Sequence, residues 1–267
     1  MPDPYASIAQ TDAALQTRLA GVLELRAADP QQRAILNDYL SAIPLSNGAA
    51  ALEIGCGTGA VTRVLAQLPG VKEAVGIDPS PVFIDQARAL ANDDRLSFHV
   101  GDGRALPFTD RSFDLVVFHT TLCHIPDGQQ ALREAHRVLR SGGWLSVFDG
   151  DYPTTTVALD PFDPLQRAVD TMVANFVHNP WLPRRLGPIM ESIGLAVASV
   201  RSHGYTQTRD ADYMLTIVDR GADLLAHANS IGADQCQALK NEARRRVAAG
   251  AFFGHISYIS VLARKPS

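Results

Sequence analysis

The stretch ALEIGCGTGAVTRVLA, residues 51–66, decides the fold, because an apolar run leads into three closely spaced glycines and helical periodicity follows directly. Glycine lacks a Cβ atom, so Gly55, Gly57 and Gly59 permit a tight turn and let a ligand lie against the backbone at a helix N-terminus. The spacing also fits the dinucleotide fingerprint, with Ala60 as the last small residue, and it fits a purely structural turn. The stretch alone therefore predicts a strand, a glycine turn and a helix, and leaves the ligand open.

Around this stretch, strand-like and helix-like segments alternate from about residue 49 to residue 149, which indicates a parallel sheet with crossover helices. The sequence predicts five strands there, at residues 49–54, 71–78, 96–102, 113–120 and 144–151. Residues 113–120 are almost continuously apolar, as in a strand that is buried on both faces.

Helical periodicity dominates the second half, where only residues 195–203 and 255–265 resemble strands. We expect helical insertions at about 152–182 and 205–252 to form a substrate cap on a single domain that spans residues 31–267. Residues 1–30 are expected to form an N-terminal lid segment, with Tyr5 and Arg18 closing over the site. Two helix faces are expected to be apolar, one with Phe162, Leu165, Val169, Met172, Val173 and Phe176, the other with Met214, Ile217, Val218, Gly221, Leu224 and Leu225.

Acidic residues stand at the carboxyl ends of three successive predicted strands, where ligands bind in open α/β sheets. The Glu53 carboxylate would attract a ligand with a cationic ammonium group and repel one with a pyrophosphate. Asp78 has the spacing to accept both ribose hydroxyls of an adenosine; it could instead cap the next helix, a role for which Ser80 competes. Asp102 could accept from an adenine amino group or simply form an Asp-Gly turn.

Taken in order, five segments resemble the class I S-adenosylmethionine-dependent methyltransferases, especially the branch of the ubiquinone/menaquinone biosynthesis methyltransferases. They are ALEIGCGTG (51–59), VGIDPS (75–80), GDGRALPF (101–108), FDLVVFHTTLCHIPD (113–127) and EAHRVLRSGGWLSVFD (134–149). The resemblance covers roughly residues 30 to 150. This chain departs from the compact family pattern between the last two strands. There, about fifty residues, from His203 to Gly254, replace a short hairpin.

The resemblance implies a Rossmann-like α/β fold with a seven-stranded sheet, mostly parallel with the last strand antiparallel, helices on both faces and a helical lid. It implies S-adenosyl-L-methionine as the methyl donor and S-adenosyl-L-homocysteine as the product. The methionine part would contact Glu53 and the glycine loop, the ribose Asp78, the adenine Asp102, and His119 would line the side next to the sulfonium. The full set of cofactor-binding residues would be Glu53, Gly55, Cys56, Gly57, Gly59, Asp78, Pro79, Asp102, Gly103, Arg104 and His119.

The expected reaction is methyl transfer by in-line displacement to a small, partly apolar acceptor. His124 is the candidate general base or substrate contact, with a loop-capping or surface role as the alternative. Asp149 and Asp151 fit a turn with one substrate-contacting aspartate better than a metal site, so we expect no metal. The acceptor pocket would be built from aromatic and thioether side chains that could equally be core: Trp181, Phe176, Met172, Tyr213 and Met214.

Composition narrows the class of protein. With 24 basic and 28 acidic side chains the net charge is −4, which argues against nucleic acid as a partner. No apolar run approaches the ~20 residues of a membrane span, and the N-terminus lacks a leader pattern, so we expect a cytoplasmic protein without membrane insertion. Three widely spaced cysteines predict neither disulfides nor zinc. An NAD(P)-dependent oxidoreductase and a non-catalytic adenosylmethionine-binding protein remain as alternatives, and the sequence does not give the oligomeric state.

Overall fold

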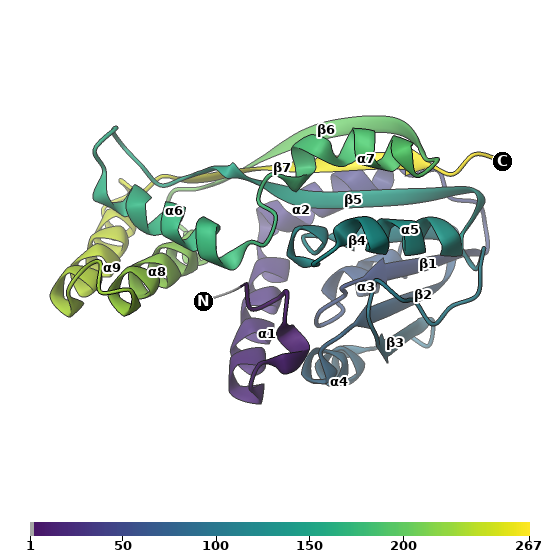
Figure 1. The fold of residues 1–267 in the computed structure, drawn as a ribbon, viewed down its shortest axis with the longest axis horizontal. Helices are drawn as coiled ribbons and strands as arrows, with labels where there is room; N and C mark the ends of the chain where they lie inside the picture. Colours follow the sequence, from purple (N-terminus) through teal and green to yellow (C-terminus); the bar gives the residue numbers. More distant parts are fainter. Residues whose placement is uncertain (1–2) are drawn as a thin grey trace.

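The computed structural model describes residues 3–267. Its strands form one seven-stranded sheet with the order β3-β2-β1-β4-β5-β7-β6 (Figure 1). β7 runs antiparallel to β5 and β6, and the other strand pairs are parallel. The Rossmann-like sheet with an antiparallel last strand is therefore confirmed. The strands are β1 (Ala49–Ile54), β2 (Val71–Asp78), β3 (Leu96–Val100), β4 (Phe113–His119), β5 (Leu139–Thr156), β6 (Ala196–Gln207) and β7 (Gly254–Arg264).

Helices cover both faces of the sheet, with α5 and α7 on one face and α2 on the other (Figure 1). The central strand β1 is buried along its whole length, as expected for a strand that is covered on both sides. The helices are α1 (Ala13–Ala28), α2 (Pro30–Ser41), α3 (Ala60–Leu65), α4 (Pro81–Leu90), α5 (Gly128–Val138), α6 (Pro164–Phe176), α7 (Leu186–Ser192), α8 (Asp212–His227) and α9 (Ala233–Ala248). Short 3-10 turns lie at Ile8–Gln10, Leu122–His124 and Leu182–Arg185.

Within the segments expected as helical insertions, the helices begin later than the segments do. β5 continues to Thr156 and β6 to Gln207, so the helices start only at Pro164 and Asp212. Phe162, expected on an apolar helix face, precedes α6 and is 92% exposed. The physical reason is that Asp163 caps α6 and Pro164 opens it, which leaves Phe162 in the preceding loop.

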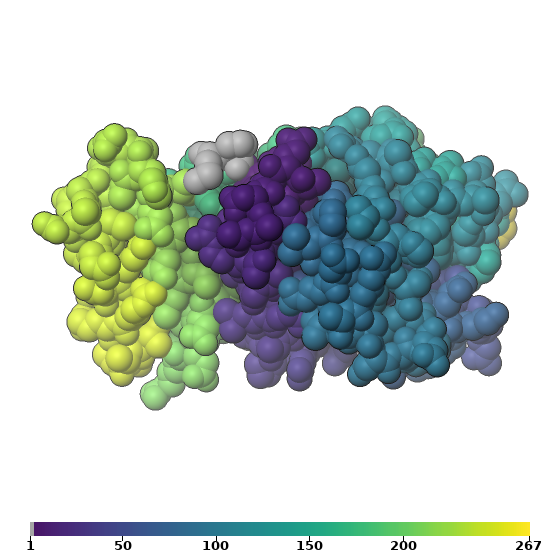
Figure 2. Space-filling view, turned by 90° about the horizontal axis from the view of Figure 1, so that it is seen from below, coloured from purple at the N-terminus to yellow at the C-terminus, as the bar shows by residue number. Residues whose placement is uncertain are grey.

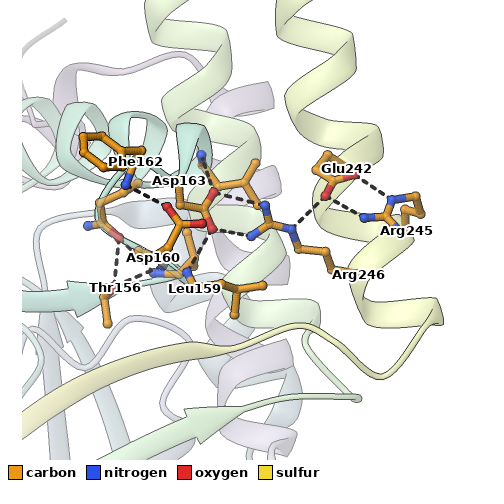
Figure 3. Close-up of polar contacts among 12 residues, drawn as sticks. Thr156, Leu159, Asp160, Phe162, Asp163, Glu242, Arg245 and Arg246 are labelled. Carbon is orange, nitrogen blue, oxygen red and sulfur yellow. Dashed lines mark hydrogen bonds and ion pairs between the residues drawn. The ribbon is translucent and has the colours of Figure 1, made fainter.

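Helices α6, α8 and α9, which we call the cap, lie together at one end of the sheet (Figure 1). α6 and α8 approach so closely that a Cβ atom on Gly221 would lie 1.8 Å from the carbonyl oxygen of Ala168. α9 is tied to the start of α6 by Arg246, which pairs with the buried Asp163 and with Glu242 (Figure 3). The cap is thus a packed unit and not a set of loose connections.

The N-terminal segment, residues 3–28, lies between the cap and the sheet (Figure 2). Ile8, Leu19 and Ala20 pack with Phe83 of α4, and the Ser80 hydroxyl lies 2.6 Å from Oε1 of Gln16. α1 also contacts α8 of the cap. In the described part of the chain, no helix combines the length and the apolar character that crossing a bilayer requires.

Candidate active site

A cavity of about 1100 Å³ opens where the N-terminal segment, the carboxyl ends of β1, β2 and β4, and the cap meet. It brings together all of the predicted site residues except Gly59. Those that line it are Glu53, Gly55, Cys56, Gly57, Asp78, Pro79, Asp102, Gly103, Arg104, His119 and His124. Residues that are distant in the sequence therefore surround one space.

The glycine loop is held by backbone hydrogen bonds and by the end of β4. Its three glycines have φ angles of +72°, +52° and +77°, a region that side chains disfavour. The amides of Gly55 and Cys56 both donate to the carbonyl of Ile77, at 2.7 and 3.0 Å, and the Thr121 hydroxyl donates to the carbonyl of Gly55. A Cβ atom on Gly59 would lie 2.5 Å from the Phe98 ring, so this glycine permits close packing of the helix on β3 and does not line the cavity.

Glu53 and Asp78 are buried carboxyl groups beside the loop. The Thr62 hydroxyl donates to Glu53, and burial, only partly opposed by this bond, raises the pKa of Glu53 to about 8. Asp78 accepts from the amides of Gly57 and Ser80, each at 2.9 Å, and burial raises its pKa to about 6. Ser80 itself caps α4 by accepting from the amide of Phe83, so Asp78 is not the helix cap.

Asp102 lies at the more open side of the cavity. Its carboxylate binds the guanidinium of Arg104 at 2.7 Å and accepts from the Arg104 amide at 2.8 Å, and this hydrogen bonding lowers the pKa of Asp102. The Asp-Gly turn expected as one alternative is therefore present, and its carboxylate still faces the cavity.

His119 is part of an aromatic stack. Its ring lies 4.7 Å from that of Phe148 at an angle of 8°, and its Nδ1 atom lies 2.7 Å from the Tyr39 hydroxyl. Burial, and next the charge of Arg26, hold the pKa of His119 well below its usual value. A neutral imidazole in this position forms a wall of the cavity.

His124 is paired with an acid from the other end of the chain. Its Nδ1 atom lies 2.7 Å from Oδ2 of Asp3, and both side chains are largely buried. The same carboxylate accepts from the amides of Tyr5 and His178, each at 2.9 Å. A carboxylate on Nδ1 fixes the ring and leaves Nε2 as the basic nitrogen, as in catalytic histidine–aspartate pairs.

Comparison with known proteins agrees with this geometry. Residues 52–147 match the family model of a methyltransferase domain. The chain is 31% identical over 166 residues to a ubiquinone/menaquinone biosynthesis C-methyltransferase of Hahella chejuensis. The matched region covers 60% of this chain and 63% of that protein. It is 34% identical over 151 residues to the 27-O-demethylrifamycin SV methyltransferase of Amycolatopsis mediterranei, covering 55% and 48%. The chain is therefore similar to class I S-adenosylmethionine-dependent methyltransferases and carries a segment that matches their domain.

The likeness to solved structures extends over more of the chain. The YcgJ protein of Bacillus subtilis superposes with a TM-score of 0.61 at 20% identity, covering 87% of this chain and 98% of that one. At that identity the likeness shows the fold alone. The chain spans 39% to 66% of the length of the curated relatives that it matches.

Two side chains provide a test of whether the cavity suits a polar ligand. The Thr58 hydroxyl and both amide atoms of Gln32 are buried, line the cavity and have no hydrogen-bond partner within residues 3–267. Leaving such a group unpaired costs about 1–3 kcal/mol. Thr58 lies in the glycine loop, so a ligand rich in polar atoms, such as an adenosyl amino acid, fits the residues that are present.

Three of the five side chains expected around the acceptor line the cavity, and two do not. Met172, Phe176 and Tyr213 line the cavity, whereas Trp181 is 49% exposed and Met214 is fully buried against Gly254. In the N-terminal segment, Tyr5 lines the cavity as expected. Arg18 is exposed and does not line the cavity, whereas Arg26, further along α1, does.

Asp149 and Asp151 do not contribute to the cavity. Asp149 is fully buried and accepts from the amides of Cys123 and Gly150, while Asp151 binds Arg184 at 2.8 Å. Residues 3–267 hold no cluster of three potential metal-binding side chains. The expected substrate contact by one of these aspartates is therefore replaced by a structural role for both.

Proposed function

We propose that this protein transfers the methyl group of S-adenosylmethionine to a small-molecule acceptor that is held between the N-terminal segment and the cap. One observation carries the proposal: a single cavity joins the glycine loop and the strand-end carboxyl groups to an aromatic surface from α6 and α8. Glu53, the glycine loop and Asp78 would hold the amino acid and ribose parts of the donor, and Asp102 and Arg104 would lie along its adenine.

When bound, the donor supplies a methyl group on a sulfonium, and the electron pair of the broken carbon–sulfur bond stays on the sulfur as a neutral thioether. The protein's task is to align the acceptor and exclude water, which can supply several orders of magnitude in rate. His124, oriented by Asp3, would take the proton that the acceptor loses as its bond to the methyl carbon forms. Asp3 is then a positioning residue.

The oxidoreductase alternative is disfavoured by Glu53, because the ionised form of this carboxyl group, buried beside the glycine loop, is stabilised by an ammonium group and repelled by a pyrophosphate. Calorimetric titration separates the two functions: we expect saturable binding of S-adenosylhomocysteine and none of NAD(P). Labelled adenosylmethionine, incubated with the protein and a metabolite extract and followed by mass spectrometry, then identifies the acceptor. Binding of NADP without binding of S-adenosylhomocysteine would contradict the proposal, and binding without any methyl transfer would favour a non-catalytic protein.

We predict that His124→Ala lowers turnover by about a hundredfold to ten-thousandfold, as expected for the loss of a general base, and leaves the affinity for S-adenosylhomocysteine unchanged. Asp3→Asn should lower turnover less and shift its pH profile, because the imidazole loses its anionic partner. Single-turnover rates across pH measure both effects. His178→Ala is the control, since that side chain is exposed and outside the cavity. Wild-type turnover in His124→Ala would remove this residue from the mechanism.

A further inference from the structure

Three arginines that line the cavity lack an acidic partner among the described residues; Arg33 is exposed, whereas Arg26 and Arg220 are half-buried. Arg26 of α1 donates to the Thr120 hydroxyl, and the guanidinium of Arg220 of α8 lies 5.7 Å from the centre of the Phe176 ring. Both line the cavity, and neither makes an ion pair within residues 3–267. Arginines that are withdrawn from solvent are normally paired, because an uncompensated charge in such a place is costly.

The carboxyl groups of the cavity cannot supply the missing charge, because each already has a partner. Glu24 binds Arg63 at 3.2 Å, Glu53 accepts from the Thr62 hydroxyl, Asp78 accepts two backbone amides, and Asp102 binds Arg104. Asp3, which lies next to the cavity, is occupied by His124 and two amides. The positive charge of Arg26 and Arg220 is therefore left for a ligand to offset.

The surroundings of these arginines indicate what kind of ligand would fit. Tyr5, Tyr152 and Tyr213 also line this cavity and offer hydroxyl groups beside the aromatic rings. Gln32, only 5% exposed, contributes an amide with no partner on either atom within residues 3–267. Met172, Phe176 and Ile217 add an apolar wall. Guanidinium and hydroxyl donors beside aromatic rings suit a planar anion on an apolar body.

From these contacts we infer that Arg26 and Arg220 recognise the methyl acceptor as an anion, such as a carboxylate, carried on an aromatic or apolar body. The inference rests on the proposed function, and it agrees with the charge of the donor. Adenosylmethionine brings a net positive charge into a cavity that already holds two uncompensated guanidinium groups. An anionic acceptor offsets this repulsion, whereas a cationic or neutral acceptor does not.

The test uses benzoate and its neutral isostere benzamide as probes, each titrated into the full-length protein with and without saturating S-adenosylhomocysteine. We expect benzoate to bind about tenfold more tightly than benzamide, the effect of one charge-assisted hydrogen bond of about 1.5 kcal/mol. Arg26→Met and Arg220→Met should each remove this preference and leave benzamide binding unchanged. Arg33→Met is the matched control, because Arg33 also lines the cavity but is exposed and donates to the carbonyl of Ala27.

Each outcome decides one point. Equal binding of the two probes, no binding of benzoate, or a preference that survives in both arginine variants overturns the inference and leaves the methyltransferase proposal standing. Loss of S-adenosylhomocysteine binding in Arg26→Met, with the benzoate preference kept, assigns that arginine to the carboxylate of the donor and overturns its role toward the acceptor. If wild-type protein prefers benzoate but does not bind S-adenosylhomocysteine, the proposed function fails and the anion site remains.

Discussion

At the scale of single residues, Glu53 shows how burial prepares a group for its ligand. The side chain is 2% exposed and its nearest donor is the neutral hydroxyl of Thr62. Without a cation beside it, the carboxyl group has a pKa of about 8 and stays protonated below that pH. An ammonium group placed next to it favours the ionised form, so in the proposed complex binding of the donor would be coupled to loss of this proton.

We therefore predict that the affinity for S-adenosylhomocysteine falls as the pH is lowered from 8 to 6. Glu53 must lose a proton to bind the ammonium group, and below its pKa this costs up to about tenfold in affinity per pH unit. Titrations at several pH values in two buffers with different ionisation enthalpies would measure the released proton. Glu53→Gln should bind weakly with a flatter pH dependence. An affinity that is constant over this range in wild-type protein would contradict the coupling.

The same variant has a predictable effect on stability in the absence of ligand. The folded pKa of Glu53 lies above its unfolded value near 4.5, so the group favours folding when protonated. That contribution is fully present below pH 4.5 and is lost as the pH rises through 8. Glu53→Gln cannot ionise, and its melting temperature should exceed that of wild-type protein most clearly above pH 8, as scanning calorimetry would show.

At the scale of elements, the sequence predicted best where local pattern and burial agree. β1 and β2 have the predicted bounds, because each is an apolar run that ends at a glycine turn or a capped helix. β5 was predicted too short. In the structure α5 stops at Val138 and β5 begins at Leu139, and the backbone of Gly142 and Gly143 pairs with that of Lys265 near the C-terminus.

The residues of the candidate site also divide into those that local sequence patterns predict and those that they do not. The strand-end acids follow from local motifs, whereas the pairing of Asp3 with His124 joins residues 121 positions apart. Arg26 and Gln32 are ordinary residues of amphipathic helices in the sequence, and only the packing of α1 and α2 on the sheet turns them toward the cavity. No local signal distinguishes such residues from a solvated helix surface.

The cap gives a prediction at this scale. Arg246 pairs with Asp163, whose side chain is 1% exposed, whereas the neighbouring Arg245 is 67% exposed and binds only Glu242 (Figure 3). Arg246→Met leaves a buried carboxylate without its cation, at a cost of about 3 kcal/mol. At about 2 to 4 °C per kcal/mol, the melting temperature should fall by roughly 6 to 12 °C. Arg245→Met should change stability by less than about 0.5 kcal/mol. Similar melting temperatures for the two variants would show that the pair does not stabilise the cap.

At the scale of the whole molecule, three parts close around one space: the sheet supplies the glycine loop, the N-terminal segment supplies Tyr5 and Arg26, and the cap supplies Phe176 and Tyr213. The N-terminal segment is held to α4 by the small cluster around Phe83, to α3 by the pair of Glu24 with Arg63, and to His124 by Asp3. A ligand that fills the cavity adds contacts between this segment and both other parts.

Ligand binding should therefore order the N-terminal segment more than the outer cap. In hydrogen exchange on the full-length protein, we predict that saturating S-adenosylhomocysteine slows the amides of residues 5–10 and 22–28, which line the cavity, and leaves those of α9 unchanged, because α9 contributes no lining residue. At a hundred times the dissociation constant, binding stabilises the closed form by about 2.7 kcal/mol, enough to slow exchange through local opening about a hundredfold. Equal slowing in α9 would indicate global stabilisation, and unchanged exchange in residues 5–10 would show that the segment does not close on the donor.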